Sequence, residues 1–123
     1  MDWKFFLLVA GGGAVGSFLR ALLGYVLRLW LPWPTLLVNI LGAFLIGFCL
    51  KHWEQNGESE IFRAFWIVGI CGGFTTFSTF GLDALNFIKS AQWFHAFIYV
   101  GSNLLGTFLA IYLGFRFYAL VNS

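Results

Sequence analysis

The chain has 123 residues, of which 60% are hydrophobic and only 10% are charged, and its formal net charge is +2. A soluble domain carries about 25% charged residues, so the composition excludes an ordinary soluble domain and predicts a single all-α membrane domain over residues 1–123. The small net charge gives no indication of a nucleic-acid partner. The sequence also lacks the catalytic sets, phosphate loops and metal-spaced cysteines that predict an enzyme.

The first apolar run covers residues 5–27, which is long enough to cross a hydrocarbon layer of about 30 Å. Gly12 and Gly16 lie four residues apart in this run, and such spacing of small residues favours the close approach of another helix. Arg20 is the basic residue well inside the run. It is either a functional charge within the membrane or a side chain that reaches the near interface, and the sequence favours neither interpretation.

The second apolar run, residues 35–50, is short and follows a connection that contains two prolines. Asn39 is its strongly polar member, and it indicates either a hydrogen bond between helices or a ligand in a pore. Ala43 and Gly47 form a second face of small residues. The polar stretch 51–60 that follows is typical of a loop.

The third apolar segment, residues 61–88, contains the run GGFTTFSTF at positions 72–80. Each glycine weakens a helix by about 1 kcal/mol relative to alanine, and hydroxyl groups need partners that hydrocarbon does not offer. The run therefore predicts a helix that ends near residue 70, a non-helical break over 72–78 at bilayer depth, and a second helix from residue 79. Carbonyls and helix ends at such a break commonly hold ions in membrane proteins.

The broken segment carries candidate ion ligands of two kinds. Phe77 and Phe80 share a face if the helix restarts after the break, and the positive edge of an aromatic ring can contact an anion. Packing is the alternative, because the chain has 16 phenylalanines. Four hydroxyl side chains can donate hydrogen bonds to an anion, offer oxygen to a cation, or simply cap the broken helix: Thr75, Thr76, Ser78 and Thr79.

The fourth apolar run, residues 94–115, carries Tyr99, Asn103 and Thr107 at intervals of four residues. They form one polar stripe on an otherwise apolar helix, which indicates either a tight packing face or a hydrogen-bonding track for a small anion. Asp83, at the end of the third segment, is predicted to be a helix cap or an interfacial charge. The sequence thus places no acidic residue deep within a span, which argues against proton-coupled multidrug export.

Four spans place both termini on one side of the membrane, and the basic residues hardly distinguish the two sides. Four Lys or Arg residues fall on the side of the termini and two or three on the other side, depending on where Arg20 is counted. Because an excess of basic residues sets orientation, this near balance is compatible with insertion both ways. Two opposed copies would form an antiparallel homodimer and supply the inverted repeat that many transporters encode in one chain.

Over residues 72–80 the chain resembles the Fluc family of fluoride channels, also called the CrcB family. The run GSFLR at 16–20 is similar to the glycine and arginine of that family's first helix, and TLLVNILG at 35–42 is similar to its asparagine region. The resemblance covers all four spans and the spacing between them. Two departures are Phe74, where an aliphatic residue is common, and Asn103, where a small hydroxyl residue can occur.

The resemblance implies a dual-topology homodimer of four-helix subunits that passively exports fluoride across the bacterial inner membrane and so lowers fluoride toxicity in the cytoplasm. It also implies a sodium ion at the dimer centre, held by the main-chain carbonyls of Gly72 and Thr75 from both subunits. Arg20 is implied to be a vestibule or structural charge. The implied fluoride-pore residues are aromatic rings, amides and hydroxyls: Phe77, Phe80, Asn39, Ser78, Thr79, Tyr99, Asn103 and Thr107.

The physical chemistry of fluoride agrees with this interpretation. Fluoride is small and strongly hydrated, so a pore must replace its water with many donors but without a fixed charge that traps the ion. From the residues alone, two other functions stay open. One is a cation channel that uses the carbonyls of the break as a filter, although the chain lacks a TVGYG run and acidic rings. The other is a structural membrane protein whose glycines and hydroxyls only pack helices.

Overall fold

The structure is a computed structural model that describes residues 2–57 and 59–123, and the described residues contain helices and no strand. The third apolar segment of the sequence is divided among four consecutive short elements, one of which is a π-helix. In chain order the elements are α1 (Trp3–Val26), the 3-10 helix η1 (Arg28–Trp30), α2 (Trp33–Asn56), α3 (Glu60–Phe62), the π-helix η2 (Arg63–Cys71), α4 (Gly72–Phe74), α5 (Ser78–Lys89) and α6 (Trp93–Val121).

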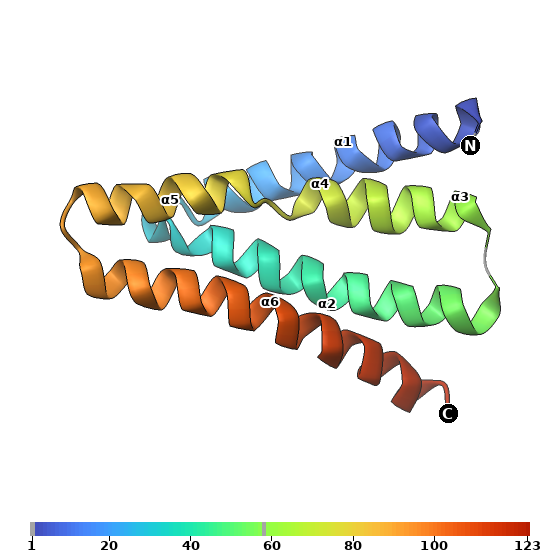
Figure 1. Cartoon of the computed structure of the whole chain (residues 1–123). Helices are drawn as coiled ribbons and strands as arrows, with labels where there is room; N and C mark the ends of the chain where they lie inside the picture. The colour runs from blue at the N-terminus through green and yellow to red at the C-terminus, as the bar shows by residue number, and fades with distance from the viewer. Residues whose placement is uncertain (1, 58) are drawn as a thin grey trace.

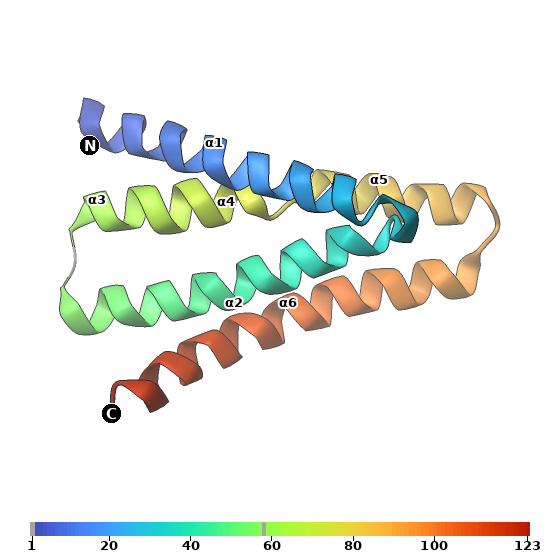
Figure 2. The ribbon, with the colours of Figure 1, turned by 180° about the vertical axis from the view of Figure 1, so that it is seen from behind.

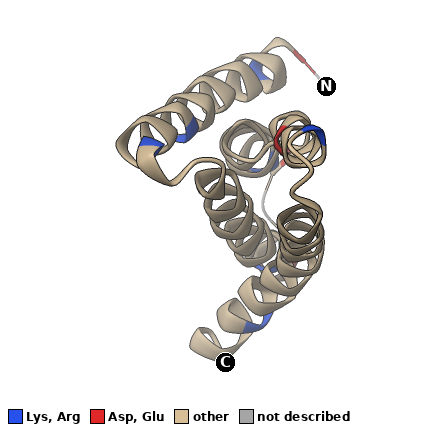
Figure 3. Ribbon diagram, turned by 90° about the vertical axis from the view of Figure 1, so that its left-hand side faces the viewer, with Lys and Arg blue, Asp and Glu red and all other residues tan. Residues whose placement is uncertain are grey.

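Four segments of the described chain are long and apolar enough to cross a membrane, which confirms the predicted number of spans. Figure 1 shows them side by side, with both termini at the same end of the bundle, as four spans require. Figure 3 shows few charged residues along the helices. The four segments are Trp3–Val26, Trp33–Asn56, Glu60–Lys89 and Trp93–Val121.

Small residues bring two pairs of segments into backbone contact. A Cβ atom added to Gly12 would lie 2.6 Å from the Phe65 carbonyl oxygen, and one added to Gly16 would overlap the Ile70 carbonyl oxygen. The predicted close approach at these two glycines is therefore confirmed, and their partner is the segment formed by η2 and α4 (Figure 2). Gly47 of α2 meets the backbone of α6 in the same way.

α2 is longer than the sequence predicts and contains most of the stretch 51–60 that was expected to be a loop. The helix continues to Asn56, and Gly57 follows it in the left-handed region with φ 57°, where glycine has no steric penalty. The Asn56 amide nitrogen donates to the His52 carbonyl oxygen at 3.0 Å and to the Tyr118 hydroxyl at 2.9 Å. These bonds hold the polar last turn on α6, and the loop prediction is wrong there; position 58 lies outside the described residues.

The interruption of the third segment is shorter than predicted, and the adjacent glycines do not form it. Gly72 and Gly73 are helical, and non-helical backbone is confined to residues 75–77, where Thr75 has φ −85° and ψ 160°. A Cβ atom on Gly73 would lie 2.6 Å from the Gly13 carbonyl oxygen of α1. The glycine is thus required for helix packing. α5 begins at Ser78, one residue earlier than expected.

Candidate functional site

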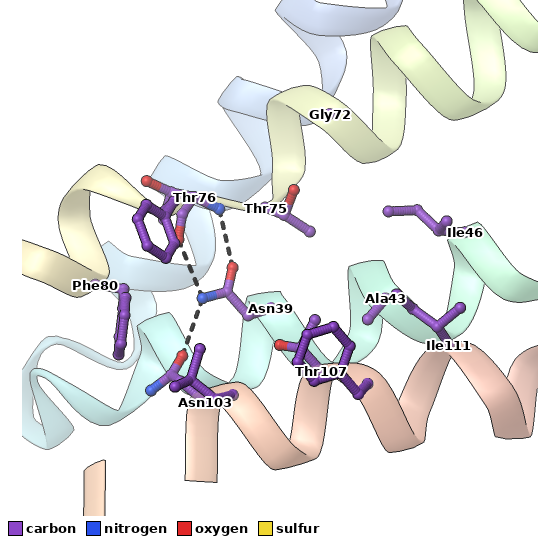
Figure 4. A pocket seen from close by; sticks show the side chains of 13 residues that line it. Asn39, Ala43, Ile46, Gly72, Thr75, Thr76, Phe80, Asn103, Thr107 and Ile111 are labelled. Carbon is purple, nitrogen blue, oxygen red and sulfur yellow. Dashed lines mark hydrogen bonds between the residues drawn. The ribbon is translucent and has the colours of Figure 1, made fainter. Parts of the chain in front are cut away.

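A cavity of about 400 Å³ lies where the interrupted segment faces α2 and α6 (Figure 4). Its polar groups are amides, hydroxyls and main-chain atoms, and the remaining lining is aliphatic or aromatic. None of the lining residues is charged: Asn39, Ala43, Ile46, Gly72, Thr75, Thr76, Phe77, Phe80, Asn103, Leu104, Thr107, Phe108 and Ile111.

The buried side chain of Asn39 joins the interruption to α6. Its Oδ1 accepts the Thr76 backbone N–H at 2.9 Å, and its Nδ2 donates to the Thr76 carbonyl oxygen at 3.1 Å and to Asn103 Oδ1 at 3.0 Å (Figure 4). One amide side chain therefore satisfies both main-chain polar groups of Thr76. A backbone turn within a hydrocarbon layer needs such a partner, because no water is available to it.

These bonds also remove the usual helical partners from two carbonyl groups. In a continuous helix the Thr76 N–H would donate to the Gly72 carbonyl, and the Thr79 N–H to the Thr75 carbonyl. Here the Thr76 N–H donates to Asn39, and the Thr79 N–H donates to Thr76 Oγ1 at 3.2 Å. The Gly72 and Thr75 carbonyls therefore lack their i+4 helical donors. These are the two carbonyls to which the family resemblance assigns a sodium ion.

The four hydroxyl residues of the segment form two groups, because Thr75 bonds to the helix before the interruption while the Thr76 hydroxyl lies 3.5 Å from that of Ser78 and accepts from the Thr79 N–H. Thr75 Oγ1 donates to the Cys71 carbonyl oxygen at 3.0 Å, and Thr76 Oγ1 accepts from the first turn of α5. Both hydroxyls therefore cap the helix ends, as the capping alternative predicts. Ser78 is exposed, and neither Ser78 nor Thr79 lines the large cavity.

A second, smaller cavity of about 150 Å³ lies on the α1 side of the interruption. Arg20, Thr35, Thr76 and Thr79 are its polar lining residues. Arg20 donates from Nε to the Gly73 carbonyl oxygen at 3.1 Å, so its side chain turns toward the interruption. Thr76 lines both cavities, and the turn that contains it is the wall between them.

The two phenylalanines of the segment lie together but differ in exposure. Their ring centroids are 5.5 Å apart, which confirms that Phe77 and Phe80 share a face. Phe80 is buried and stacks on Tyr99 with ring centroids 5.8 Å apart, whereas the Phe77 side chain is 78% exposed in the single chain. One wall of the cavity, at Phe77, is therefore exposed at the surface of the chain.

The polar stripe of α6 is divided between two sites. Asn103 and Thr107 line the large cavity, but Tyr99 does not. Tyr99 is fully buried, and its hydroxyl donates to Asp83 Oδ2 at 2.7 Å, while Thr35 Oγ1 donates to the same oxygen at 2.9 Å. The expectation that Asp83 is a helix cap is wrong, since its carboxylate links α2, α5 and α6 from within α5, and its role as an interfacial charge stays a prediction.

Sequence reasoning missed the apolar part of the cavity, which comes from α2 and α6. Its spacing on each helix could have shown it. On α2 the lining residues follow Asn39 at intervals of four and three residues, and those of α6 flank Thr107, so each set occupies one helical face. The missed residues are Ala43, Ile46, Leu104, Phe108 and Ile111.

Comparison with known proteins gives two consistent results. The sequence model of the family described as "CrcB-like protein, Camphor Resistance (CrcB)" matches residues 7–115. Among curated proteins, the chain is 45% identical to a "Fluoride-specific ion channel FluC" of Thermus thermophilus, with 90% of this chain and 92% of the relative covered. The proteins of the same name from Nitrobacter winogradskyi and Rhizobium meliloti are 42% and 40% identical, with 85% and 88% of this chain and 88% and 90% of the relatives covered.

Proposed function

The chain belongs to the CrcB-like family, and from that membership we propose that it is a fluoride-selective channel that lets fluoride leave the cell passively. The structural observation that carries this proposal is the uncharged cavity beside the interrupted helix, with amide, hydroxyl and phenylalanine residues in its lining. Such donors replace the hydration of a small anion, while the lack of a fixed positive charge leaves the anion free to depart. The protein is a channel and not an enzyme.

The two cavities offer different chemical groups to the ion. Phe77 and Phe80 line the large cavity, where the positive edge of an aromatic ring can contact an anion, and Thr107 of α6 is a hydroxyl residue of the same lining. Arg20 and Thr79 lie in the smaller cavity on the other side of Thr76. Their positive charge and hydroxyl attract an anion toward the interruption without entering the uncharged cavity.

Anion efflux from liposomes that contain the purified protein tests the function. An ion-selective electrode compares fluoride with chloride release from vesicles loaded with both salts and made permeable to potassium. We expect rapid fluoride release without chloride release. Release of both anions, or of neither, overturns the proposed function, and potassium-selective flux without an added ionophore would favour a cation channel instead.

The exposed position of Phe77 supports a homodimer as the functional unit. Its ring lines the cavity yet is 78% exposed, so in one chain the cavity would open to lipid, which cannot hydrate an anion. A second copy that covers this opening in the opposite orientation fits the near balance of basic residues at the two ends. In this arrangement the interruption lies at bilayer depth in the bacterial inner membrane.

Labelling of an introduced cysteine tests the dual orientation. A membrane-impermeant thiol reagent applied to spheroplasts that express Asn122→Cys should reach about half of the copies, and the other half only after permeabilisation. The native thiols of Cys49 and Cys71 are buried, so the parent protein is the control. Labelling of all copies, or of none, from outside contradicts dual topology.

The two freed carbonyls support a structural sodium ion at the centre of such a dimer. Gly72 and Thr75 each lose the N–H that would close a helix on them, and hard oxygen donors suit an alkali cation. When bound, the ion supplies positive potential between the two pores. The thermal unfolding temperature should fall when N-methylglucamine replaces sodium, and an unchanged temperature would contradict the site independently of any flux.

A further inference from the structure

All the hydrogen-bonding groups of the Asn39 amide are engaged by the protein. An amide nitrogen has two N–H donors, and those of Asn39 go to the Thr76 carbonyl oxygen at 3.1 Å and to Asn103 Oδ1 at 3.0 Å (Figure 4). Its oxygen accepts the Thr76 N–H at 2.9 Å. An anion that reaches Asn39 must therefore displace one of these acceptors.

The orientation of both amides follows from their other partners. The Thr76 main chain offers one donor and one acceptor to Asn39, and this fixes which atom of the Asn39 amide is nitrogen. Asn103 is 3% exposed, and its Nδ2 donates to the Tyr99 carbonyl oxygen at 3.0 Å, one turn earlier in α6. That bond directs the Asn103 oxygen toward Asn39, so the pair has one consistent arrangement.

The two bonds of the Asn39 nitrogen differ in what their loss would cost. The bond to Thr76 belongs to a two-point contact that satisfies both main-chain groups of a buried turn. The bond to Asn103 is a single contact between two side chains. The Asn103 bond is therefore the one that can be exchanged for an incoming anion.

We propose that Asn103 is a positioning residue that competes with fluoride for one N–H group of Asn39 and thereby weakens fluoride binding; this inference rests on the proposed function. Fluoride gains a charge-assisted hydrogen bond, which is stronger than the bond between two neutral amides, so the exchange is favourable. Loss of the hydrogen bond between Asn39 and Asn103 reduces the net free energy of fluoride binding. Conduction requires that the anion bind weakly enough to leave. Asn103 meets this requirement because its oxygen accepts the Asn39 N–H again when fluoride departs.

Two variants remove the acceptor in different ways. Asn103→Leu keeps the number and branching of the side-chain heavy atoms, whereas Asn103→Ser shortens the side chain so that it no longer reaches Asn39. Ser102→Ala on the same helix, outside the lining of both cavities, is the control. The initial fluoride efflux rate is measured against internal fluoride concentration to separate the half-saturating concentration from the maximal rate. The increase in thermal unfolding temperature on addition of sodium fluoride, relative to sodium chloride, measures binding without flux.

We expect the half-saturating concentration to fall roughly fivefold in both variants, because one hydrogen bond no longer competes. The fluoride-induced thermal shift should grow accordingly, and Ser102→Ala should match the parent protein. A purely structural role would lower the unfolding temperature and the maximal rate but leave the half-saturating concentration and the fluoride-induced shift unchanged. That result in either folded variant overturns the inference, whereas a parent protein without fluoride efflux overturns the proposed function instead.

Discussion

The interrupted segment has two faces that are held in different ways. On the α1 side, the contact is between backbones, since a Cβ atom on Gly16 would overlap the Ile70 carbonyl oxygen and one on Gly73 would press on α1. On the side of α2 and α6, the contact is the Asn39 amide, which reaches across to the main chain of Thr76. A cavity of about 400 Å³ remains around that amide.

The difference shows how one segment can be both rigid and accessible. At Gly16 and Gly73 the backbones are in contact and leave no space for an ion or water, so these contacts fix the position of the segment, and the smaller cavity lies beside them at Arg20. On the other face the Asn39 side chain bridges a gap between α2 and the interruption. This gap leaves room for a ligand. We therefore expect changes at the glycines of the α1 face to affect folding, and changes on the cavity face to affect fluoride flux.

The largest effect is expected from Gly16→Ala. The new Cβ atom would overlap the Ile70 carbonyl oxygen and lie 2.8 Å from the Phe74 nitrogen, and neither backbone atom can move without displacing the segment. Overpacking of this kind should lower the free energy of unfolding by about 3 kcal/mol. Tryptophan fluorescence during thermal unfolding in detergent measures the loss.

The matched control is Gly11→Ala, also in α1, where an added Cβ atom meets nothing within 4 Å. This variant should unfold at the temperature of the parent protein or slightly above it, because alanine favours a helix. Equal effects of the two substitutions would show that the α1 face is not held by close packing.

The next effect tests the cavity face with two neighbouring phenylalanines. Phe80→Ile should lower the free energy of unfolding by about 2 kcal/mol, because Phe80 is buried against Tyr99. Phe77→Ile should leave the stability of a single chain almost unchanged, since Phe77 is exposed there. Both variants should lose fluoride efflux.

Size-exclusion chromatography of Phe77→Ile provides the control for assembly. A dimeric, stable and inactive Phe77→Ile protein would exclude a structural protein whose phenylalanines only pack helices. Full fluoride efflux by the same variant would instead remove Phe77 from the ion path and leave the cavity face without its expected role.

The sequence was sufficient for the parts that depend on periodicity and composition. Four spans follow from apolar length, and the α1 contact follows from the spacing of Gly12 and Gly16. The exact position of the interruption could not be predicted, because it depends on a side chain 37 residues away, that of Asn39, which takes the Thr76 N–H from the helix. Propensity alone assigned the break to residues 72–78 and so included Gly72 and Gly73, which tertiary packing keeps helical.

The role of Asp83 was missed for a similar reason. Position in the sequence suggested a helix end, but the carboxylate is defined by two hydroxyls from other helices, those of Thr35 and Tyr99. Helical spacing predicted that Tyr99, Asn103 and Thr107 share a face. It could not show that hydrogen bonding would assign Tyr99 to one site and the other two to another.

A smaller effect is expected from Tyr99→Phe, which removes one of the two donors to Asp83 Oδ2. The remaining donor, Thr35, still satisfies that oxygen, so the free energy of unfolding should fall by about 1.5 kcal/mol. Tyr112→Phe, an exposed position of the same helix, is the control. A loss as large as that of Gly16→Ala would mean that substitutions on the side of α2 and α6 cost as much stability as those on the α1 side. The contrast between the two faces would then fail.

The smallest effect is expected where the α1 face carries polar groups. Ser17 Oγ donates to the Gly73 carbonyl oxygen at 3.5 Å in an exposed position, and Arg20 Nε donates to the same oxygen at 3.1 Å. Ser17→Ala should change the free energy of unfolding by less than about 0.5 kcal/mol, and Arg20→Met should lower it by about 1 kcal/mol. If chemical denaturation shows either loss to equal that of Gly16→Ala, then hydrogen bonds rather than backbone contact hold the segment on α1. If both losses stay small while Arg20→Met still slows fluoride efflux, the guanidinium acts on the ion and not on the fold.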